Sequence, residues 1–345
     1  DVITLTLDPS ETVGTPTCTW TDGSGAMEDT SVTYATVSNT DHHTAAVTVH
    51  NDDDDGAVAF SCTYSDLAGN AIASAITGLS SGSAITIDNT HPTWTSVTFA
   101  SGDYVNNAED ESAINLVIIT VGVDNDQVVT ATLNSANYQC TITSNTCTAS
   151  ITSAGLKGLT SGTSYTFSVA VSDAAGNAAT ADTSESFTYD ITAPTSTTAV
   201  ESTTGSGDAN DGDLVSITLN PSEVVATPVC TFTDGDGAME DTSVTYTTTS
   251  VDSHVATVTV HNDDDDGEVG FSCTYSDLAG NAIAAAITSA TSGDVTIDNT
   301  HPTSTTAVES VDGSGDANDG DVFTVTLNPS EDVGTPTCTF TDTSG

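Results

Sequence analysis

Two runs of four consecutive aspartates carry the most specific chemistry in this chain of 345 residues. They occupy residues 52–55 and 263–266, and each follows His-Asn and precedes Gly. Carboxylates held this close repel one another, and a divalent cation relieves the repulsion, since Ca²⁺ takes roughly six to eight oxygen ligands. The ligands we predict in the two runs are Asp52, Asp54, Asp263 and Asp265. The competing interpretation is a solvated acidic loop that binds no ion.

Other aspartates recur in a loop and at segment junctions. The sequence DANDGD at residues 208–213 superficially resembles a calcium loop, although its glycine falls one residue too early for the EF-hand pattern. Each junction begins with an aspartate, in DNTHP or DITAP. The ligands we predict in this set are Asp88, Asp190, Asp208, Asp211 and Asp298.

Seven cysteines provide a second kind of chemistry. Two pairs lie 44 and 43 residues apart at equivalent positions of a repeated sequence, which predicts the disulfides Cys18–Cys62 and Cys230–Cys273. A third disulfide, Cys140–Cys147, is predicted as a staple across a hairpin. The sequence has no Cys-x-x-Cys pair of the kind that binds zinc, and no neighbouring cation that would activate a thiol. Disulfides in successive repeats are typical of extracellular proteins.

The net charge excludes whole classes of partner. The chain has 49 acidic residues against a single basic one, Lys157, and its formal charge is −48. A basic face for nucleic acid is therefore missing, and no stretch approaches the roughly 18 apolar residues of a membrane span. We expect no nucleic-acid partner and no direct membrane insertion. Signatures such as Gly-x-Ser-x-Gly and His-Glu-x-x-His are absent from the sequence, and we expect no enzymatic activity.

These residues are positioned by a long internal repeat. The segment DVITLTLDPSETVGTPTC from Asp1 returns as DLVSITLNPSEVVATPVC from Asp213 and begins again at Asp321. The junction prolines are spaced 102 and 108 residues apart, which is the size of one β-sandwich. We predict domains over residues 1–91 (without its first strand), 92–192 (divergent) and 193–300, and a partial domain over 301–345.

Within each repeat the apolar residues alternate with polar ones. One face of a short run carries Ile3, Leu5 and Leu7, and in the second repeat Phe167, Val169 and Val171 share a face. A period of two over short runs bounded by Gly, Asp, Asn and Pro indicates half-buried antiparallel strands. We expect an all-β fold with no helix longer than a turn or two.

Several motifs resemble a known family. They are DVITLTLDPSE, FSCTYSDLAGNA (60–71 and 271–282), SVAVSDAAGNAA (168–179) and the linker DITAPT (190–195). They resemble bacterial-type immunoglobulin-like repeats, found in giant adhesins and in some archaeal surface-layer proteins. The resemblance implies tandem immunoglobulin-like antiparallel β-sandwiches, many of which use Ca²⁺ to stiffen domain junctions. In such a sandwich the loops after the first strand and before the sixth lie where the last strand exits, so the predicted ligands of the third repeat should converge.

The favoured hypothesis is a non-enzymatic extracellular structural protein. It would be a rod-like array that builds a cell-surface filament, sheath or surface layer by self-association with identical subunits or neighbouring repeats. The alternative is the extender region of an adhesin, whose surface receptor is bound by a head outside this segment. Donor-strand exchange between subunits is a further hypothesis, because the first repeat begins without its first strand.

Overall fold

The computed structural model describes residues 1–345 except 37–41, 204–206, 236, 251–252, 311–316 and 343–345. The described part is almost entirely β-structure, with one four-residue helix, α1 (Ser153–Leu156). In that part, no helix has the length and apolar character needed to cross a membrane. The chain forms two compact units, Asp1–Thr192 and Ala193–Gly345. The prediction of an all-β fold made of tandem antiparallel sandwiches is confirmed.

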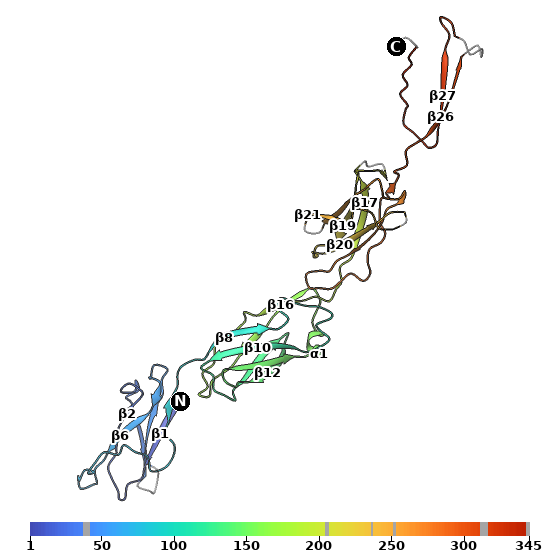
Figure 1. The fold of residues 1–345 in the computed structure, drawn as a ribbon. Helices are drawn as coiled ribbons and strands as arrows, with labels where there is room; N and C mark the ends of the chain where they lie inside the picture. Colours follow the sequence, from blue (N-terminus) through green and yellow to red (C-terminus); the bar gives the residue numbers. More distant parts are fainter. Residues whose placement is uncertain (37–41, 204–206, 236, 251–252, 311–316, 343–345) are drawn as a thin grey trace. The chain divides into compact units, whose positions relative to one another are not determined.

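The first domain has a core of alternating apolar side chains, among them Ile3, Leu5 and Leu7 on one strand. Its sheets are ordered β1-β4-β3, β2-β6 and β5-β7. The strands are β1 (Val2–Leu7), β2 (Thr17–Thr21), β3 (Thr33–Thr36), β4 (His43–Thr48), β5 (Gly56–Ala57), β6 (Ala59–Thr63) and β7 (Thr86–Ile87). The alternation of buried and less buried residues on β1, β2 and β4 places one face of each strand in the core. Figure 1 labels β1, β2 and β6 of this domain.

The second domain has a larger aromatic core. Phe99, Phe167 and Phe187 are buried, and their ring centroids lie 4.8 to 5.7 Å apart. Its sheets are ordered β13-β10-β8, β12-β11-β15 and β14-β16-β9. The strands are β8 (Thr93–Phe99), β9 (Tyr104–Val105), β10 (Ile114–Val121), β11 (Val128–Leu133), β12 (Ala136–Thr141), β13 (Thr146–Ile151), β14 (Thr163–Thr166), β15 (Ser168–Ala170) and β16 (Ser186–Tyr189).

The third domain repeats the strands of the first and has two more, β17 and β18. Its sheets are ordered β17-β19-β22-β21, β20-β24 and β18-β25-β23. The strands are β17 (Ser196–Ser202), β18 (Asp208–Ala209), β19 (Leu214–Pro221), β20 (Val229–Thr233), β21 (Thr245–Ser250), β22 (Ser253–Thr259), β23 (Gly267–Glu268), β24 (Gly270–Thr274) and β25 (Thr296–Ile297). The last described elements, β26 (Ser304–Ser310) and β27 (Phe323–Pro329), form a two-stranded pair with exposed apolar side chains such as Val308.

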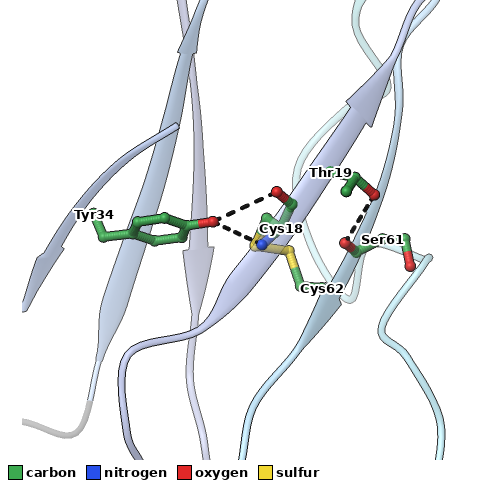
Figure 2. The surroundings of a disulfide bond; sticks show 5 residues. All are labelled: Cys18, Thr19, Tyr34, Ser61 and Cys62. Carbon is green, nitrogen blue, oxygen red and sulfur yellow. Dashed lines mark hydrogen bonds between the residues drawn. A yellow bond between two sulfur atoms is a disulfide. The ribbon is translucent and has the colours of Figure 1, made fainter. Parts of the chain in front are cut away.

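The two long disulfides each tie neighbouring strands of one sheet. Cys18 on β2 lies directly opposite Cys62 on β6, with their Cα atoms 4.1 Å apart. Tyr34 on β3 belongs to the other sheet, and its Oη accepts the Cys18 N–H at 2.7 Å (Figure 2). The predicted bond between Cys230 and Cys273 has the same arrangement in the third domain. The disulfide therefore fixes one sheet, and the tyrosine joins that sheet to its partner.

The second domain replaces the long disulfide with packing. Ala131 and Val169 face each other across β11 and β15, and both are fully buried. The predicted disulfide between Cys140 and Cys147 is present. The predicted hairpin is present at the turn, where Thr143 and Thr146 pair in antiparallel fashion, although β12 and β13 then continue into different sheets. The bond lies beside a tight turn at the point where the chain crosses from one sheet to the other, so it staples the two layers.

Candidate functional site

The aspartate run of the first domain is held by backbone N–H groups. The second aspartate of the run, Asp53, is buried, with 4% of its surface exposed. Its Oδ2 accepts the N–H of His50 at 2.8 Å, and its Oδ1 accepts the N–H of Glu28 at 2.8 Å. A buried carboxylate requires such donors, because an unpaired buried charge is very costly. One carboxylate of the run thus closes its own turn and ties it to a neighbouring loop.

The fourth aspartate of the run, Asp55, binds the linker that leaves the domain. Its Oδ1 accepts the N–H of Asn89 at 2.6 Å, and its Oδ2 accepts the hydroxyl of Thr90. These two donors, the Thr90 hydroxyl first, lower the pKa of Asp55 below its ordinary value. The Asn89 side chain in turn donates to the carbonyls of His50 at 3.0 Å and Asp53 at 2.9 Å. The linker is therefore fastened to the aspartate turn by side chains on both partners.

Glycine is required where the turn meets the loop before it. Gly56 has φ of +146°, and a Cβ on Gly56 would lie 2.7 Å from the Cα of Gly23. A Cβ on Gly23 would lie 2.2 Å from the carbonyl oxygen of Asp55. The two backbones touch, so the final glycine of the Asp-Asp-Asp-Asp-Gly motif permits this packing.

The other side of the linker is held by the second domain. The turn at 173–177 is closed by Asp173, whose buried carboxylate accepts the N–H groups of Gly176 and Asn177 at 2.8 Å each. The Asn177 side chain then donates to the backbone carbonyl of Asp88 at 2.8 Å. His91 in the linker lies with its Nδ1 2.8 Å from the carbonyl oxygen of Ala178. Residues 88–91 are thus hydrogen-bonded to both the first and the second domain.

The third domain builds the same end from its own residues. Asn299 donates its N–H to Asp266 at 2.6 Å, and its side chain donates to the carbonyls of His261 and Asp264. The Asn299 side-chain oxygen accepts the N–H of Asp211 at 3.0 Å. The Asp298 N–H donates to the carbonyl of Ala209 at 2.9 Å. Strand β18 with the turn after it, the second aspartate run and the segment after β25 therefore meet at one end of this domain.

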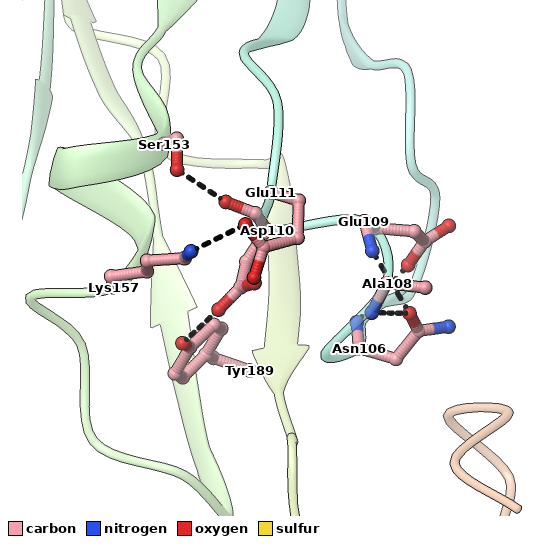
Figure 3. A network of polar contacts seen from close by, with 8 residues as sticks. All are labelled: Asn106, Ala108, Glu109, Asp110, Glu111, Ser153, Lys157 and Tyr189. Atoms are coloured by element: carbon pink, nitrogen blue, oxygen red, sulfur yellow. Dashed lines mark hydrogen bonds and ion pairs between the residues drawn. The ribbon is translucent and has the colours of Figure 1, made fainter.

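The second domain has a different end, which contains the chain's single lysine. After β13 it forms α1, whose N-cap Thr152 accepts the N–H of Gly155. Lys157 follows and forms an ion pair with Glu111, with Nζ and Oε2 2.7 Å apart (Figure 3). The hydrogen bond from Lys157 to Glu111 raises the pKa of the lysine. The second domain therefore has a helix and a lysine at the position where the first and third domains have four aspartates.

A buried carboxylate lies beside that ion pair. Asp110 is 2% exposed, and its Oδ2 accepts the hydroxyl of Tyr189 at 2.6 Å (Figure 3). Its backbone carbonyl accepts the hydroxyl of Ser153 at 2.6 Å. Burial, followed by the hydrogen bond to Asp110, raises the pKa of Tyr189 to about 12. These contacts link the loop before β10, helix α1 and strand β16.

The predicted ligands occupy exposed or half-exposed positions. Asp52 and Asp263, the first aspartates of the two runs, are exposed. Asp54 accepts the Ser24 hydroxyl and donates its N–H to Asp22, and Asp265 donates its N–H to Asp234. Three predicted ligands accept the N–H of the residue two positions further on, and these are Asp88, Asp190 and Asp298. Asp208 on β18 and Asp211 in the turn that follows it are exposed.

Sequence reasoning missed the residues that make most of these contacts. They are the second and fourth aspartates of each run, the linker asparagines and the turn aspartates: Asp53, Asp264, Asp55, Asp266, Asn89, Asn299, Asp173 and Asp277. The signal available in the sequence was the repetition of DNT after each run and of Asp-x-x-Gly-Asn in each repeat.

The acidic ends offer oxygen ligands of the kind that Ca²⁺ prefers, and neither the first nor the third domain has a lysine or arginine to neutralise them. Many of those oxygens already accept N–H groups. Within either unit, the described residues bring no three acidic or histidine ligand atoms within 4.8 Å of one another. These side chains thus do not form a preformed coordination site. An ion would bind at the surface, and exposed groups such as Asp52 and Asp263 would have to move toward it. The calcium ligands stay a prediction.

No protein-family model and no curated protein matches the chain. Several solved structures are similar to it. One, of a 1.5-MDa bacterial ice-binding adhesin, has 20% identity and a TM-score of 0.39 over 86% of this chain and 88% of that one. A Ca²⁺-stabilised adhesin with which an Antarctic bacterium binds ice has 20% identity and a TM-score of 0.38 over 86% and 69%. A tetra-tandem repeat from the extending region of a large adhesion protein has 18% identity and a TM-score of 0.33 over 94% and 83%.

Proposed function

We propose that this chain is a non-enzymatic, extracellular structural protein, in which immunoglobulin-like domains are joined in series to build a filament, sheath or surface layer. The observation that carries the proposal is the linker at 88–91, which is hydrogen-bonded to the domain before it and to the domain after it. A linker fastened on both sides resists bending, whereas a flexible tether would leave its backbone to water.

The composition supports the same role. Each of three successive domains contains a disulfide, as expected for small cores outside the reducing cytosol. The charge of −48 keeps exposed strand edges apart at low salt. At high ionic strength that repulsion weakens, since the screening length falls to about 3 Å near 1 M salt. A saline exterior would therefore suit both the folding and the assembly of such a chain.

Surface-bound Ca²⁺ is part of the proposal for the first and third domains. Their ends gather aspartates with no lysine or arginine, and a cation there would reduce repulsion and restrain the linker. The corresponding end of the second domain has its own cation in Lys157 and has less need of an added ion. Calcium would stabilise the joints that follow the first and third domains, because each of these aspartate runs already holds the asparagine that comes after it.

Electron microscopy of the producing cells, with gold-labelled antibody against this chain, tests the proposal. Label along a regular surface structure would support it. Label on isolated strings that end in a distinct head would instead favour the alternative, the extender of an adhesin that binds a surface receptor. Label confined to the cell interior would contradict both.

A further inference from the structure

Strand β13 of the second domain has one edge that no other strand covers. The equivalent strands β4 and β22 each lie between two neighbours, in the orders β1-β4-β3 and β17-β19-β22-β21. In the second domain β12 pairs instead with β11 in another sheet, so β13 ends the order β13-β10-β8. This edge lies in the middle of the chain, in a domain whose residues are all described. The open edge therefore results from the strand arrangement of this domain itself.

The free backbone groups on this edge belong to Thr148 and Ser150. A backbone N–H of β10 donates to the carbonyl of Asn145 at 2.9 Å, so the odd-numbered residues of β13 bond to β10 and the even-numbered ones face the open edge. The first outward position, Thr146, exchanges backbone bonds with Thr143 in the turn. In the described part of the chain, no backbone bond reaches Thr148 or Ser150 from that side. Such unpaired groups at a sheet edge are a template for another strand.

The first and third domains close the position that Thr148 leaves open. Ala46 of β4 pairs with Thr33 of β3, and Thr257 of β22 pairs with Thr245 of β21. Ala46 and Thr257 are equivalent to Thr148 in the registers with β1, β19 and β10. In these two domains a further strand therefore covers the backbone groups at this position.

The next outward position is capped by an aspartate in the same two domains. The N–H of Thr48 donates to Oδ2 of Asp29 at 3.2 Å, and the N–H of Thr259 donates to Oδ2 of Asp241 at 3.4 Å. Ser150 occupies this position in the second domain, and no described carboxylate accepts its N–H. The second domain therefore lacks both the strand and the carboxylate that cover this edge in the other domains.

Charge favours a contact between two copies at this edge. Residues 127–172 contain no aspartate or glutamate, although 49 of the 345 residues of the chain are acidic. They include the single basic residue, Lys157, and they form β11 to β15 together with α1. Two copies with a charge of −48 repel each other, and the repulsion is weakest where neither surface carries a carboxylate.

We propose that β13 binds β13 of a second copy of this chain, as an antiparallel pair around a two-fold axis. Thr148 would lie opposite Ser150 of the second copy, and each such pair exchanges two backbone bonds. The sheets of the two copies then join into one continuous sheet. Because both copies use the same surface, the contact closes as a dimer and does not propagate to further copies. This inference concerns association in solution and does not depend on where the protein is located, so it is tested separately from the proposed function.

Sedimentation velocity of the full chain over a series of protein and salt concentrations tests the proposal. We expect a monomer–dimer equilibrium that shifts toward dimer with added salt, because salt screens the charge on both copies. Thr148→Asp should abolish the dimer, because it brings like charges close together on either side of the axis. Thr98→Asp is the matched control, since Thr98 and Thr148 are both exposed and lie on opposite sides of Val117. A wild-type chain that stays monomeric throughout, or an equal response to both substitutions, overturns the proposal.

Engineered cysteines test the register. In a Cys338→Ser background, which removes the free cysteine, one chain carries Thr148→Cys and another carries Ser150→Cys. The two chains mixed should form a disulfide-linked dimer on a non-reducing gel, because their cysteines would face each other across the axis. Either variant alone should form much less, since the cysteines of its two copies would be diagonal neighbours. Equal amounts of dimer from the single variants and from the mixture, or none from any of them, would contradict the proposed pairing.

Discussion

The first and second domains differ in the segment that follows equivalent strands of the sandwich, which is acidic in the first domain and contains a lysine in the second. After β4 the first domain makes a turn of four aspartates, in which Asp53 and Asp55 accept N–H groups from their own turn and from the linker. After β13 the second domain makes a short helix followed by Lys157, which pairs with Glu111. Both solutions satisfy the backbone groups that a strand end exposes.

The difference shows that an aspartate run in this fold serves first as a set of hydrogen-bond acceptors. Two of the four carboxylates in each run, the second and the fourth, hold backbone or linker groups. The first, Asp52 or Asp263, is exposed. The structural role thus falls to particular residues of the motif and leaves the first aspartate free for the proposed cation, whereas the second domain has a helix in place of the whole run.

The chain offers a separate optical probe for each of the two domains. It has two tryptophans, Trp20 in the first domain and Trp94 in the second. Replacing either with Phe in the full chain leaves a single fluorescent reporter, and the third domain already carries Phe232 at the place of Trp20. Unfolding of the first and second domains can therefore be followed one at a time.

The largest expected difference concerns the disulfides. Cys18→Ala with Cys62→Ala opens a loop of 44 residues, which should lower the free energy of unfolding of the first domain by about 4 kcal/mol. Cys140→Ala with Cys147→Ala opens a loop of 7 residues and should cost the second domain about 2.5 kcal/mol. Urea unfolding followed by the two tryptophan reporters measures both. Equal losses would show that the loop-entropy argument does not govern these domains.

The next largest losses of stability are expected when the hydrogen bonds of the buried carboxylates are removed. Asp53→Ala leaves the N–H groups of His50 and Glu28 without their acceptor, and should destabilise the first domain by about 2 kcal/mol. Tyr189→Phe removes the donor to Asp110 and should cost the second domain about as much. The same urea unfolding measures both losses. Asp52→Ala is the matched control for the first change, and a loss as large as that of Asp53→Ala would contradict the division of roles within the run.

The two domains should respond to opposite extremes of pH. The pKa of Asp55 is lowered on folding, so its stabilisation is complete above about pH 4 and is lost as the pH falls through the folded value. The pKa of Tyr189 is raised to about 12, so its stabilisation is present below about pH 10 and is lost as the pH rises toward 12. The Trp20 reporter should show acid destabilisation and the Trp94 reporter alkaline destabilisation. Asp55→Asn should weaken the acid response, which Asp22, Asp29 and Asp66 share because their pKa values are also lowered. Tyr189→Phe should weaken the alkaline response, to which Lys157 also contributes because its pKa is raised.

The smallest effect should come from calcium. Added Ca²⁺ should raise the melting temperature of the first domain slightly and reversibly, with chelator restoring the original value, and should leave the second domain unchanged. Lys157→Glu removes the cation of the second domain and should make its melting temperature respond to Ca²⁺ as well. Lys157→Gln, which adds no carboxylate, is the control. A first domain that melts identically with Ca²⁺ and with chelator would contradict the cation part of the proposed function.

Local sequence was enough to place the strands and pair the cysteines. The alternation at Ile3, Leu5 and Leu7 gives the same buried face in the fold, because strand side chains point to opposite sides with a period of two. The repeat also placed Val169 where its neighbours have a cysteine, and the structure finds it opposite Ala131 in the same position. The hairpin turn expected between Cys140 and Cys147 is present, with Thr143 paired to Thr146. The sequence did not show that β12 and β13 join different sheets, because a tight turn looks alike whether its strands pair or part into two sheets.

The sequence by itself determined a repeated all-β chain, its disulfides and its overwhelming negative charge, since each follows from residue types and their spacing. Only the tertiary structure decided which aspartates of a run are acceptors, because that depends on N–H groups from Glu28 and Asn89, which lie 25 and 34 residues away from Asp53 and Asp55. Hydrogen-bond partners and burial are properties of the folded neighbourhood, and residues distant in the chain supply them.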